Sequence, residues 1–318
     1  MTRNSAIILV VLFFVVSCTN KELHTNIENP IILVSGYGSK VTVWENTGFV
    51  DFLQEQGLVY GGKLAVGENK LNTNISEKEI VGNIDFFSLA YSDSTSRVED
   101  LSFELEKIIE FVKKYTNAEK VMLLGYSMGG VVCRNYLVEN RRNHNVESLI
   151  TISSPHKGSF LANIATSTSG YIAEKAASIY LGLITRELEL SIDGEALNNL
   201  LVEEDENFIS KLNNSQHPLD INYISIIGIN KLANTMNPFL SKLGLSIYDG
   251  DLVCSSESQN MSNIAWFVEN RPTSLIAHEI KDVHHLNILE HYNDIYSYIT
   301  YYIKPITIEE DILTDTHQ

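Results

Sequence analysis

The sequence is poor in cysteine and in basic residues. Its three cysteines are too few for a disulfide framework. Lysine and arginine together number 23 against 40 aspartates and glutamates, so the formal net charge is −17. Nucleic-acid-binding proteins present basic patches, and anionic lipid headgroups attract basic segments. The charge therefore argues against nucleic acid as a partner and against electrostatic attraction to anionic headgroups.

The N-terminal segment contains a basic residue, Arg3, followed by an apolar run at 6–16. A helix that crosses a bilayer needs about 20 apolar residues, so this run is too short to span one. A basic start before a short apolar run predicts a secretory signal peptide at residues 1–17. The Val-Val-Ser-Cys sequence at 15–18 resembles a bacterial lipobox, in which the cysteine becomes the lipidated first residue of the mature protein.

Lipidation of Cys18 would attach the protein to a membrane. More than one acyl chain gives stable attachment, which a single chain does not. Residues 19–29 are polar, so we expect residues 18–29 to form a flexible tether. The segment predicts a lipid-anchored protein of the bacterial cell envelope, with its folded body outside the cytoplasm. A plain signal peptide with a coincidental cysteine and an uncleaved anchor are the alternatives.

The remaining residues, 30–318, are expected to form one globular domain, since the sequence has 44% hydrophobic and 20% charged residues. Apolar strands alternate with amphipathic helices, such as the helix that opens at the capping-box spacing 96–99 and ends at Asn117, whose apolar residues recur at i, i+3 and i+4. This order predicts an α/β fold with a mostly parallel sheet of about six strands and helices on both faces. The predicted strands are 31–34, 84–91, 121–124, 149–152, 221–229 and 274–278, with a further candidate at 58–66. Other predicted elements are helices at 44–56, from 129 onward and at 292–303, and a polar loop at 69–79.

Residues 120–139 contain the most informative motif. Val121–Leu124 is a short apolar strand, and a helix is expected from Gly129 onward. Between them lies Gly-Tyr-Ser-Met-Gly at 125–129, a G-x-S-x-G sequence at a strand-to-helix turn, which is typical of a nucleophile elbow. The tight turn needs bare positions two before and two after the serine. It exposes the Ser127 hydroxyl at a helix N-terminus, where developing negative charge is favoured. A turn that only packs a helix on a sheet is the alternative.

A glycine-rich turn, Ser-Gly-Tyr-Gly-Ser at 35–39, follows the first predicted strand. In a serine hydrolase, the loop after the first core strand supplies one N–H group of the oxyanion hole. By position this donor is the Tyr37 amide, and the Met128 amide is its partner. An ordinary turn between a strand and a helix is the alternative.

Candidates for an acid and a base follow the serine in the order that this elbow geometry takes, Ser, Asp, His. Asp249 and Asp251 follow the predicted strand 221–229, and both are candidates for the group that orients a histidine. His284 and His285 lie between the last predicted strand and the last helix. Paired histidines also occur in metal sites, but no cysteine or carboxylate is spaced as a further ligand, so no metal is expected.

Residues 160–217 interrupt the alternation of strands and helices, with apolar-rich helical stretches at 172–187 and 196–212. An insertion at this point would cover the carboxyl ends of the strands, so we expect a helical cap or lid. Packing helices without mobility are the alternative. His156, just before the insertion, comes too early in the order to be the base. We expect it to be a structural loop residue near the mouth of the site.

Together these motifs resemble the lipase and esterase branch of the α/β-hydrolase superfamily, especially secreted bacterial triacylglycerol lipases, over residues 30–303. The matching segments are the turn at 34–39, the segment 120–137 with the elbow and the arginine that follows it, Arg134, the Ser-Ser-Pro-His-Lys-Gly-Ser stretch at 153–159, and the acid loop at 250–258.

Three positions depart from that family's pattern. Ser35 and Tyr126 stand where the family has histidine, and Leu252 stands where it has glycine. None of the three removes a catalytic group.

The resemblance selects one residue from each candidate pair. The family's G-D-G-V-V-P-x-x-S-A pattern fits the acid loop when Asp251 is the acid, and its two apolar residues after the histidine fit His285. The resemblance therefore implies a Ser127–His285–Asp251 triad that cleaves carboxylic esters, with lipids as the expected substrates, through an acyl-enzyme and without a cofactor. The alternatives are a phospholipase, thioesterase or acyltransferase with the same triad, and a catalytically dead hydrolase fold that only binds.

Overall fold

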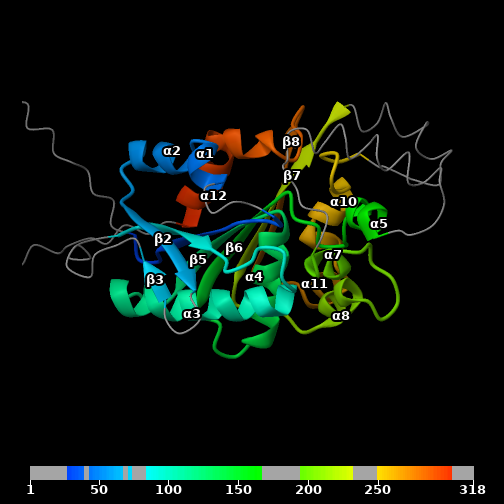
Figure 1. Cartoon of the computed structure of the whole chain (residues 1–318), viewed down its shortest axis with the longest axis horizontal. Helices are drawn as coiled ribbons and strands as arrows, with labels where there is room; N and C mark the ends of the chain where they lie inside the picture. The colour runs from blue at the N-terminus through cyan, green and yellow to red at the C-terminus, as the bar shows by residue number, and fades with distance from the viewer. Residues whose placement is uncertain are drawn as a thin grey trace, which may run out of the picture.

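One twisted sheet runs through the part of the chain that the structure describes (Figure 1). The computed structural model describes residues 27–38, 43–66, 71–73, 84–166, 194–231 and 249–302. Eight strands lie in the order β3-β2-β4-β1-β5-β6-β7-β8, and every neighbouring pair is parallel except β3 with β2. The strands are β1 (Ile31–Val34), β2 (Tyr60–Val66), β3 (Leu71–Thr73), β4 (Phe86–Ala90), β5 (Val121–Tyr126), β6 (Val146–Ile152), β7 (Asn222–Ile229) and β8 (Ser274–Lys281).

The predicted count of about six strands is too low. Six parallel strands fall at the firmly predicted positions, and β2 falls at the further candidate position. β3 lies inside the segment 69–79, which was predicted to be a polar loop, and pairs with the end of β2. A three-residue edge strand is ordered by its pairing with β2 rather than by an apolar run of its own, so no hydrophobic pattern marks it.

The strands at the centre of the sheet are apolar on both faces. β1, β4 and β5 are buried along their whole lengths. Parallel strands that are covered on both sides form continuous apolar runs, whereas half-exposed strands alternate. The central strands therefore require helices on each face of the sheet.

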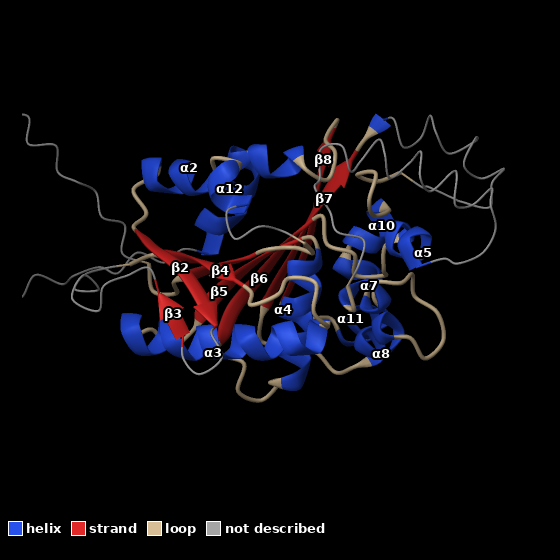
Figure 2. Cartoon of the chain, viewed as in Figure 1, coloured by secondary structure: helices blue, strands red, loops and turns tan. Residues whose placement is uncertain are grey.

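Helices do cover both faces, as predicted (Figure 2). One hydrophobic cluster joins the sheet to helices on the first face, and a second cluster joins it to helices on the other face. The first face carries α3 (Val98–Thr116), α4 (Met128–Glu139), α7 (Ala196–Asn199), α8 (Phe208–Asn214) and α11 (Ala265–Asn270). The second face carries α1 (Val43–Asn46), α2 (Phe49–Glu55) and α12 (Tyr292–Tyr302). The other described helices are α5 (Phe160–Thr166), α10 (Ser256–Gln259) and the short 3₁₀ helices η2 (Met261–Asn263) and η3 (Asn287–Glu290).

Two predicted helices are each divided in two. The helix expected at 44–56 breaks at Gly48, whose φ of 76° is left-handed, and a Cβ there would lie 2.8 Å from the Tyr292 hydroxyl. The helix expected at 196–212 is interrupted between Asn199, where α7 ends, and Phe208, where α8 begins, and four consecutive acidic residues, 203–206, lie in this gap. Like charges in one helical turn repel each other, and Asn207 then caps the start of α8 by accepting a hydrogen bond from an amide of its first turn.

The C-terminal described part of the predicted cap, which begins at residue 194, is hydrogen-bonded to loops at the edge of the sheet. Ala196 N–H donates to the Thr95 carbonyl at 3.0 Å, and Ser159 N–H donates to the Leu200 carbonyl at 2.8 Å. Thr95 follows β4 and Ser159 follows β6, so both attachments lie at the carboxyl edge of the sheet. The predicted helical stretch at 172–187 lies outside the described residues.

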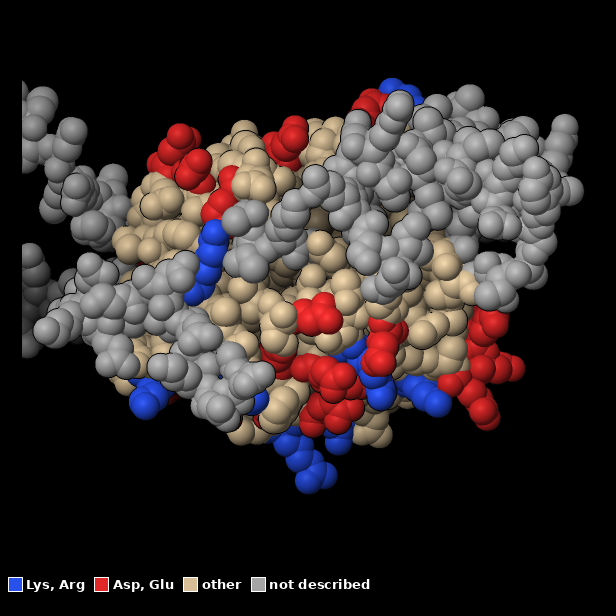
Figure 3. Space-filling view, viewed as in Figure 1, with Lys and Arg blue, Asp and Glu red and all other residues tan. Residues whose placement is uncertain are grey.

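The described surface is acidic on the face shown in Figure 3. Acidic side chains gather over α3 and beside the loop that leads into α8, with basic side chains between and below them. α3 contributes Glu99, Asp100, Glu104, Glu106 and Glu110, and the loop contributes residues 203–206. None of the helices in the described residues combines the length and apolar character needed to cross a bilayer.

Helix α3 depends on a cap from a distant segment. The Asn199 side chain, which is buried, accepts a hydrogen bond from Val98 N–H at 3.1 Å. We expect Asn199→Ala to lower the free energy of unfolding by about 1 kcal/mol, because Val98 N–H loses its acceptor. Asn198→Ala, on the exposed side of the same helix, is the control and should leave stability unchanged. Urea denaturation followed by circular dichroism measures both, and equal losses in the two variants would contradict the capping role.

Candidate active site

Ser127 lies at the turn between β5 and α4, at the carboxyl edge of the sheet. Its φ is 54° and its ψ is −129°, a conformation that residues other than glycine rarely adopt. Main-chain hydrogen bonds hold this strained residue. Ser127 N–H donates to the Ile152 carbonyl at 2.8 Å, and Gly130 N–H donates to the Ser127 carbonyl at 3.1 Å. The strand, turn and helix expected of a nucleophile elbow are therefore present.

The tight turn at Ser127 can form because glycines next to it leave room for neighbouring backbone segments. A Cβ on Gly129 would lie 2.4 Å from the Val34 carbonyl oxygen, and a Cβ on Gly125 would lie 2.6 Å from the backbone of the first turn of α4. Both positions must stay bare, as the sequence predicted. A Cβ on Gly36 would lie 2.7 Å from Ser127 Cβ, so the loop after β1 rests directly on the serine.

Three predicted side chains meet at this elbow. Nε2 of His285 lies 2.8 Å from Ser127 Oγ, and Nδ1 of His285 lies 2.6 Å from Oδ2 of Asp251. Asp251 is fully buried, His285 is 6% exposed, and Ser127 is partly exposed. The contact with a carboxylate assigns the proton of the neutral ring to Nδ1. Nε2 is therefore the acceptor that faces the serine hydroxyl.

The loop after β7 orients Asp251. Its second oxygen, Oδ1, accepts hydrogen bonds from the amides of Val253 at 2.9 Å and Cys254 at 2.8 Å. His285 N–H donates to the Asp251 carbonyl at 2.9 Å. Leu252, which stands where the resembled family has glycine, has a φ of 78°. This left-handed conformation favours glycine, so Leu252 adopts it at a cost in backbone strain.

The second member of each candidate pair has a different role. Asp249 is exposed, and its carbonyl accepts a hydrogen bond from Ser256 N–H at 2.6 Å. Nδ1 of His284 accepts hydrogen bonds from the amides of Leu286 and Asn287, each at 3.3 Å. Asp249 therefore stabilises the acid loop through its backbone, and His284 caps the turn that follows His285.

Cys254 places a thiol beside the acid and the base. Its Sγ lies within 4.8 Å of an Asp251 oxygen and a His285 nitrogen, a group that resembles a metal-ligand set. Burial, and then the charge of Asp251, raise the pKa of the Cys254 thiol well above its usual value, so the sulfur stays protonated. Metal–ligand bonds of about 2 Å each would hold the oxygen and the nitrogen more than 2.6 Å apart. The observed Asp251–His285 contact is therefore a hydrogen bond.

The predicted oxyanion-hole donors lie on segments that adjoin Ser127. Met128 is the first residue of α4, so its N–H has no acceptor within the helix. Tyr37 follows Gly36 in the loop that rests on the serine. The Tyr37 hydroxyl lies 2.8 Å from the position that a Cβ on Gly194 would take, so its side chain extends to the described end of the cap. The catalytic role of the two amides stays a prediction.

A buried polar cluster supports the elbow from behind. Arg134, on α4, is fully buried, and it forms no salt bridge among the described residues. Its Nη1 lies 3.3 Å from Nδ1 of His156, and its Nη2 lies 2.9 Å from Oδ1 of Asn213 and 3.0 Å from Nε2 of His217. Burial lowers the pKa of Arg134 to about 9. His156 is structural, as expected, but it lies fully buried behind the elbow rather than near the mouth of the site.

Arg134 determines the protonation of both histidines. Arginine has no acceptor atom, so each ring nitrogen that faces it is unprotonated. His217 therefore carries its proton on Nδ1 and donates to the Ser215 carbonyl at 2.9 Å. His156 carries its proton on Nε2, 3.1 Å from Thr151 Oγ1. Burial, and then the charge of Arg134, lower the pKa of both histidines well below the usual value, so both are neutral at neutral pH.

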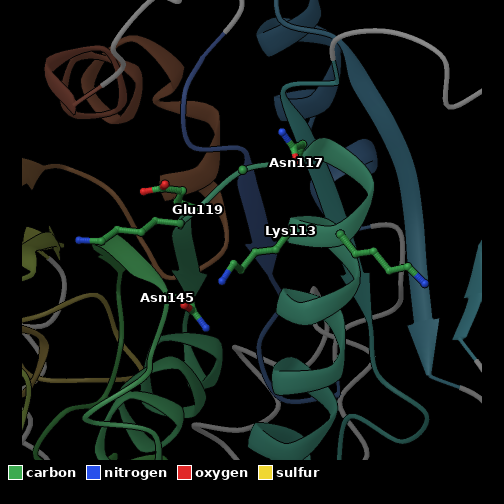
Figure 4. Close-up of a pocket in the computed structure, with 7 residues that line it drawn as sticks. Lys113, Asn117, Glu119 and Asn145 are labelled. Atoms are coloured by element: carbon green, nitrogen blue, oxygen red, sulfur yellow. The ribbon is translucent and has the colours of Figure 1, made fainter.

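A basic groove lies at the opposite edge of the sheet (Figure 4). It lies between the end of α3 and the start of β5 and is lined by Lys113, Lys114, Asn117, Ala118, Glu119, Lys120 and Asn145. β5 is six residues long, which puts this edge about 20 Å from Ser127. Lys120 pairs with Glu147 at 3.2 Å. The groove is therefore separate from the cluster around Ser127.

A parallel sheet with a nucleophile elbow, and with a histidine and a carboxylate from later loops at the serine, defines an α/β hydrolase of the lipase and esterase type. A family model described as the PGAP1-like alpha/beta domain matches residues 29–187. This is half of the 318 residues, and the chain belongs to this family. The match includes the loop after β1 and Ser127, whereas Asp251 and His285 lie beyond it.

Curated proteins match short parts of the chain. Triacylglycerol lipase 2 of Saccharomyces cerevisiae is 38% identical over 69 residues, 21% of this chain and 21% of the yeast protein. The GPI inositol-deacylase of Candida albicans is 26% identical over 84 residues, 24% of this chain and 22% of that protein. The lysosomal thioesterase PPT2-B of Xenopus laevis is 38% identical over 58 residues, 18% of this chain and 20% of that protein. The chain therefore matches about a fifth of the length of these relatives.

Solved structures match nearly the whole chain. The mature lipase BlEst2 of Bacillus licheniformis has a TM-score of 0.55 at 16% identity, over 87% of this chain and 92% of its own. The Staphylococcus hyicus lipase has a TM-score of 0.50 at 15% identity, over 88% of this chain and 96% of its own. At these identities the likeness establishes the α/β-hydrolase fold.

Sequence reasoning missed two groups that support the site. The Tyr126 hydroxyl donates to the His285 carbonyl at 2.7 Å, between residues 159 positions apart. Asn213 and His217 reach Arg134 across 79 and 83 positions. No periodicity or local motif connects residues at these separations, so only the folded chain reveals them.

The buried histidines make stability dependent on pH. In the folded protein His156 and His217 stay neutral, whereas in the unfolded chain each binds a proton near pH 6.5. The unfolded state therefore binds more protons below that pH. We expect the free energy of unfolding to fall as the pH drops below about 6.5, by up to about 1.4 kcal/mol per pH unit for each histidine.

The variant His217→Gln tests this origin of the pH dependence. It removes one histidine with a lowered pKa. The number of protons bound on unfolding, which sets the slope of stability against pH, should therefore decrease by about one between about pH 5 and about pH 6. Urea denaturation at several pH values gives the slope for the wild-type protein and the variant. An unchanged slope would show that His217 does not contribute to it.

Proposed function

We propose that this protein is a serine hydrolase that cleaves carboxylic esters and that its substrates are lipids. The observation that carries the proposal is the hydrogen-bond chain from Ser127 Oγ through His285 to Asp251, with distances of 2.8 and 2.6 Å. The serine is partly exposed, and the carboxylate is fully buried and accepts two backbone amides. A nucleophile, a base and an orienting acid in this arrangement support acyl transfer.

In the proposed reaction, Ser127 Oγ attacks the ester carbonyl while Nε2 of His285 takes its proton. Asp251 stabilises the imidazolium that forms. The amides of Met128 and Tyr37 donate to the oxyanion, and each donor of this kind contributes about 3–4 kcal/mol to transition-state stabilisation. Nε2 then gives its proton to the leaving alcohol, which leaves an acyl group on Ser127. Water releases the acyl group with His285 again as the base.

The matched relatives differ in the leaving group of the ester or thioester that they are named for. The matched relatives carry the names of a triacylglycerol lipase, an inositol-deacylase and a thioesterase, so their names agree on an acyl group and differ in its partner. A phospholipase, a thioesterase and an acyltransferase use the same triad, and each is an outcome of the substrate tests below. A dead fold that only binds is opposed by the intact Ser127, His285 and Asp251.

Fluorophosphonate labelling of the folded protein tests the nucleophile. We expect labelling of the wild-type protein and none of Ser127→Ala, together with a loss of ester hydrolysis of at least about a thousandfold. Short- and long-chain p-nitrophenyl esters, a phospholipid and an acyl thioester then identify the leaving group. Wild-type protein that is folded but neither labelled nor active on any of these substrates would overturn the proposal.

The two aspartates of the acid loop form a matched pair. We expect Asp251→Asn to lower kcat by about ten-thousandfold, because the buried carboxylate no longer orients and stabilises the imidazole. Asp249→Asn is the control, since the Asp249 side chain is exposed. It should hydrolyse esters at the wild-type rate. Equal activity in the two variants would refute the assignment of Asp251 as the acid.

We also propose that the protein is a lipoprotein held on a bacterial membrane through Cys18. The support comes from the sequence, namely the apolar run at 6–16 followed by the Val-Val-Ser-Cys sequence. Cys18 lies outside the described residues. In a bacterial host we expect metabolic labelling with a palmitate analogue and recovery in the membrane fraction, and both should be lost in Cys18→Ser. Cys254→Ser serves as the control. Labelling that persists in Cys18→Ser would contradict the anchor.

A further inference from the structure

The main chain of His285 is held on both sides. Its N–H donates to the Asp251 carbonyl at 2.9 Å, and its carbonyl accepts a hydrogen bond from the Tyr126 hydroxyl at 2.7 Å. The first bond joins the base to the acid loop. The second joins the base to the residue directly before Ser127. The two peptide groups beside His285 therefore connect to the same two segments that its ring atoms contact.

The Tyr126 side chain is buried among other rings, which hold its hydroxyl in place for the bond to the His285 carbonyl. It is the last residue of β5, so its side chain and that of Ser127 leave the backbone in different directions. The ring is 4% exposed and lies 5.3 Å from the His285 ring, centroid to centroid, and 6.2 Å from the ring of Trp44. Burial, and then the charge of Asp251, raise the pKa of Tyr126 far above its usual value, so the hydroxyl remains a neutral donor.

The segment that carries His285 needs such a connection. It lies between β8 and η3 and begins at Asp282, whose φ of 64° is left-handed. Beyond the histidine, Ile288 and Leu289 are buried in the hydrophobic cluster of the second face, which also contains Tyr126. The hydrogen bonds of the ring set the orientation of the imidazole, but they do not fix the distance between this segment and the elbow. The hydrogen bond from Tyr126, at the end of β5, to the His285 carbonyl fixes that distance.

We propose that Tyr126 is a positioning residue for the base, because its hydroxyl holds the His285 backbone at the distance that brings Nε2 to Ser127 Oγ. The inference rests on the proposed function. Tyr126 does not touch the reacting atoms, and it acts through the position of His285. Misplacement of a catalytic group by about 1 Å costs on the order of a hundredfold in rate, so a single hydroxyl at this place has a measurable effect.

The alternative is that the hydroxyl only satisfies a buried polar group. Tyr136 provides a matched control for this alternative. Its hydroxyl donates to the His144 carbonyl, also at 2.7 Å, and its side chain is 2% exposed. Tyr136→Phe therefore removes a bond of the same type and length from a place away from Ser127. The two variants should lose similar stability, whereas only Tyr126→Phe should affect the base.

Two readouts distinguish positioning from a merely structural role. The first is the second-order rate constant of fluorophosphonate labelling per folded protein. We expect a fall of about ten- to a hundredfold in Tyr126→Phe and no change in Tyr136→Phe. The second is the far-downfield proton resonance of His285 Nδ1–H, which arises from its short bond to Asp251. We expect this resonance to broaden or shift in Tyr126→Phe only.

The outcomes separate this inference from the proposed function. A folded wild-type protein that is neither labelled nor active on any of the test substrates refutes the proposed function, and the Nδ1 resonance, which needs no substrate, still tests the positioning role. A Tyr126→Phe protein with the wild-type labelling rate and resonance overturns the inference. If that variant does not fold, Tyr126→His replaces it, because the shorter ring also loses the bond to the His285 carbonyl while it stays aromatic. The same slower labelling is then expected, and a wild-type rate overturns the inference.

Discussion

The close approach of three backbone segments at Ser127 is the constraint on which the site depends. The loop after β1, the end of β5 and the start of α4 meet there without space for a side chain, so Gly36, Gly125 and Gly129 cannot carry one. Parallel pairing produces this meeting, because β1 and β6 lie on either side of β5 and end at the same edge. Backbone strain at a serine persists only where the surroundings over-determine it. Here the Ser127 amide bonds to the end of β6, and the rest of the site is assembled around that fixed point.

The side chains that pack behind the elbow form a buried polar cluster, and burying polar groups affects the stability of the fold. Burying the guanidinium of Arg134 removes it from water, and neutral acceptors from His156, Asn213 and His217 replace that solvation. Such a cluster adds little net stability compared with apolar packing, but removal of any one partner leaves a buried charge that is poorly solvated. The cluster also requires both histidines to be neutral. The orientation of α4 behind the elbow is therefore tied to hydrogen-bond geometry and to pH, rather than to hydrophobic contact alone.

Sequence similarity and structural similarity extend over different parts of the chain. The family model ends at residue 187, and it includes the elbow but neither the acid nor the base. The solved lipases match 87% and 88% of the chain at identities of 16% and 15%. The difference has a physical reason. The elbow is restricted by contacts between backbones, which few residue types permit, whereas Asp251 and His285 need only converge on one atom from loops whose other residues are free to vary.

The sequence by itself determined what contiguous residues specify. Apolar runs marked seven of the eight strands, the glycines around Ser127 marked the elbow, and the order of serine, acid and histidine marked the triad candidates. Resemblance to known hydrolases, rather than spacing, separated Asp251 from Asp249 and His285 from His284. Only the tertiary structure decided the features that depend on partners far along the chain. These are the break of the first helix at Gly48 beside the Tyr292 hydroxyl, the burial of His156, and the bond from Tyr126 to the base. Periodicity and steric rules act over a few residues, whereas these features arise when distant segments come into contact, as Tyr126 and His285 do across 159 positions, and that contact exists only once the chain has folded.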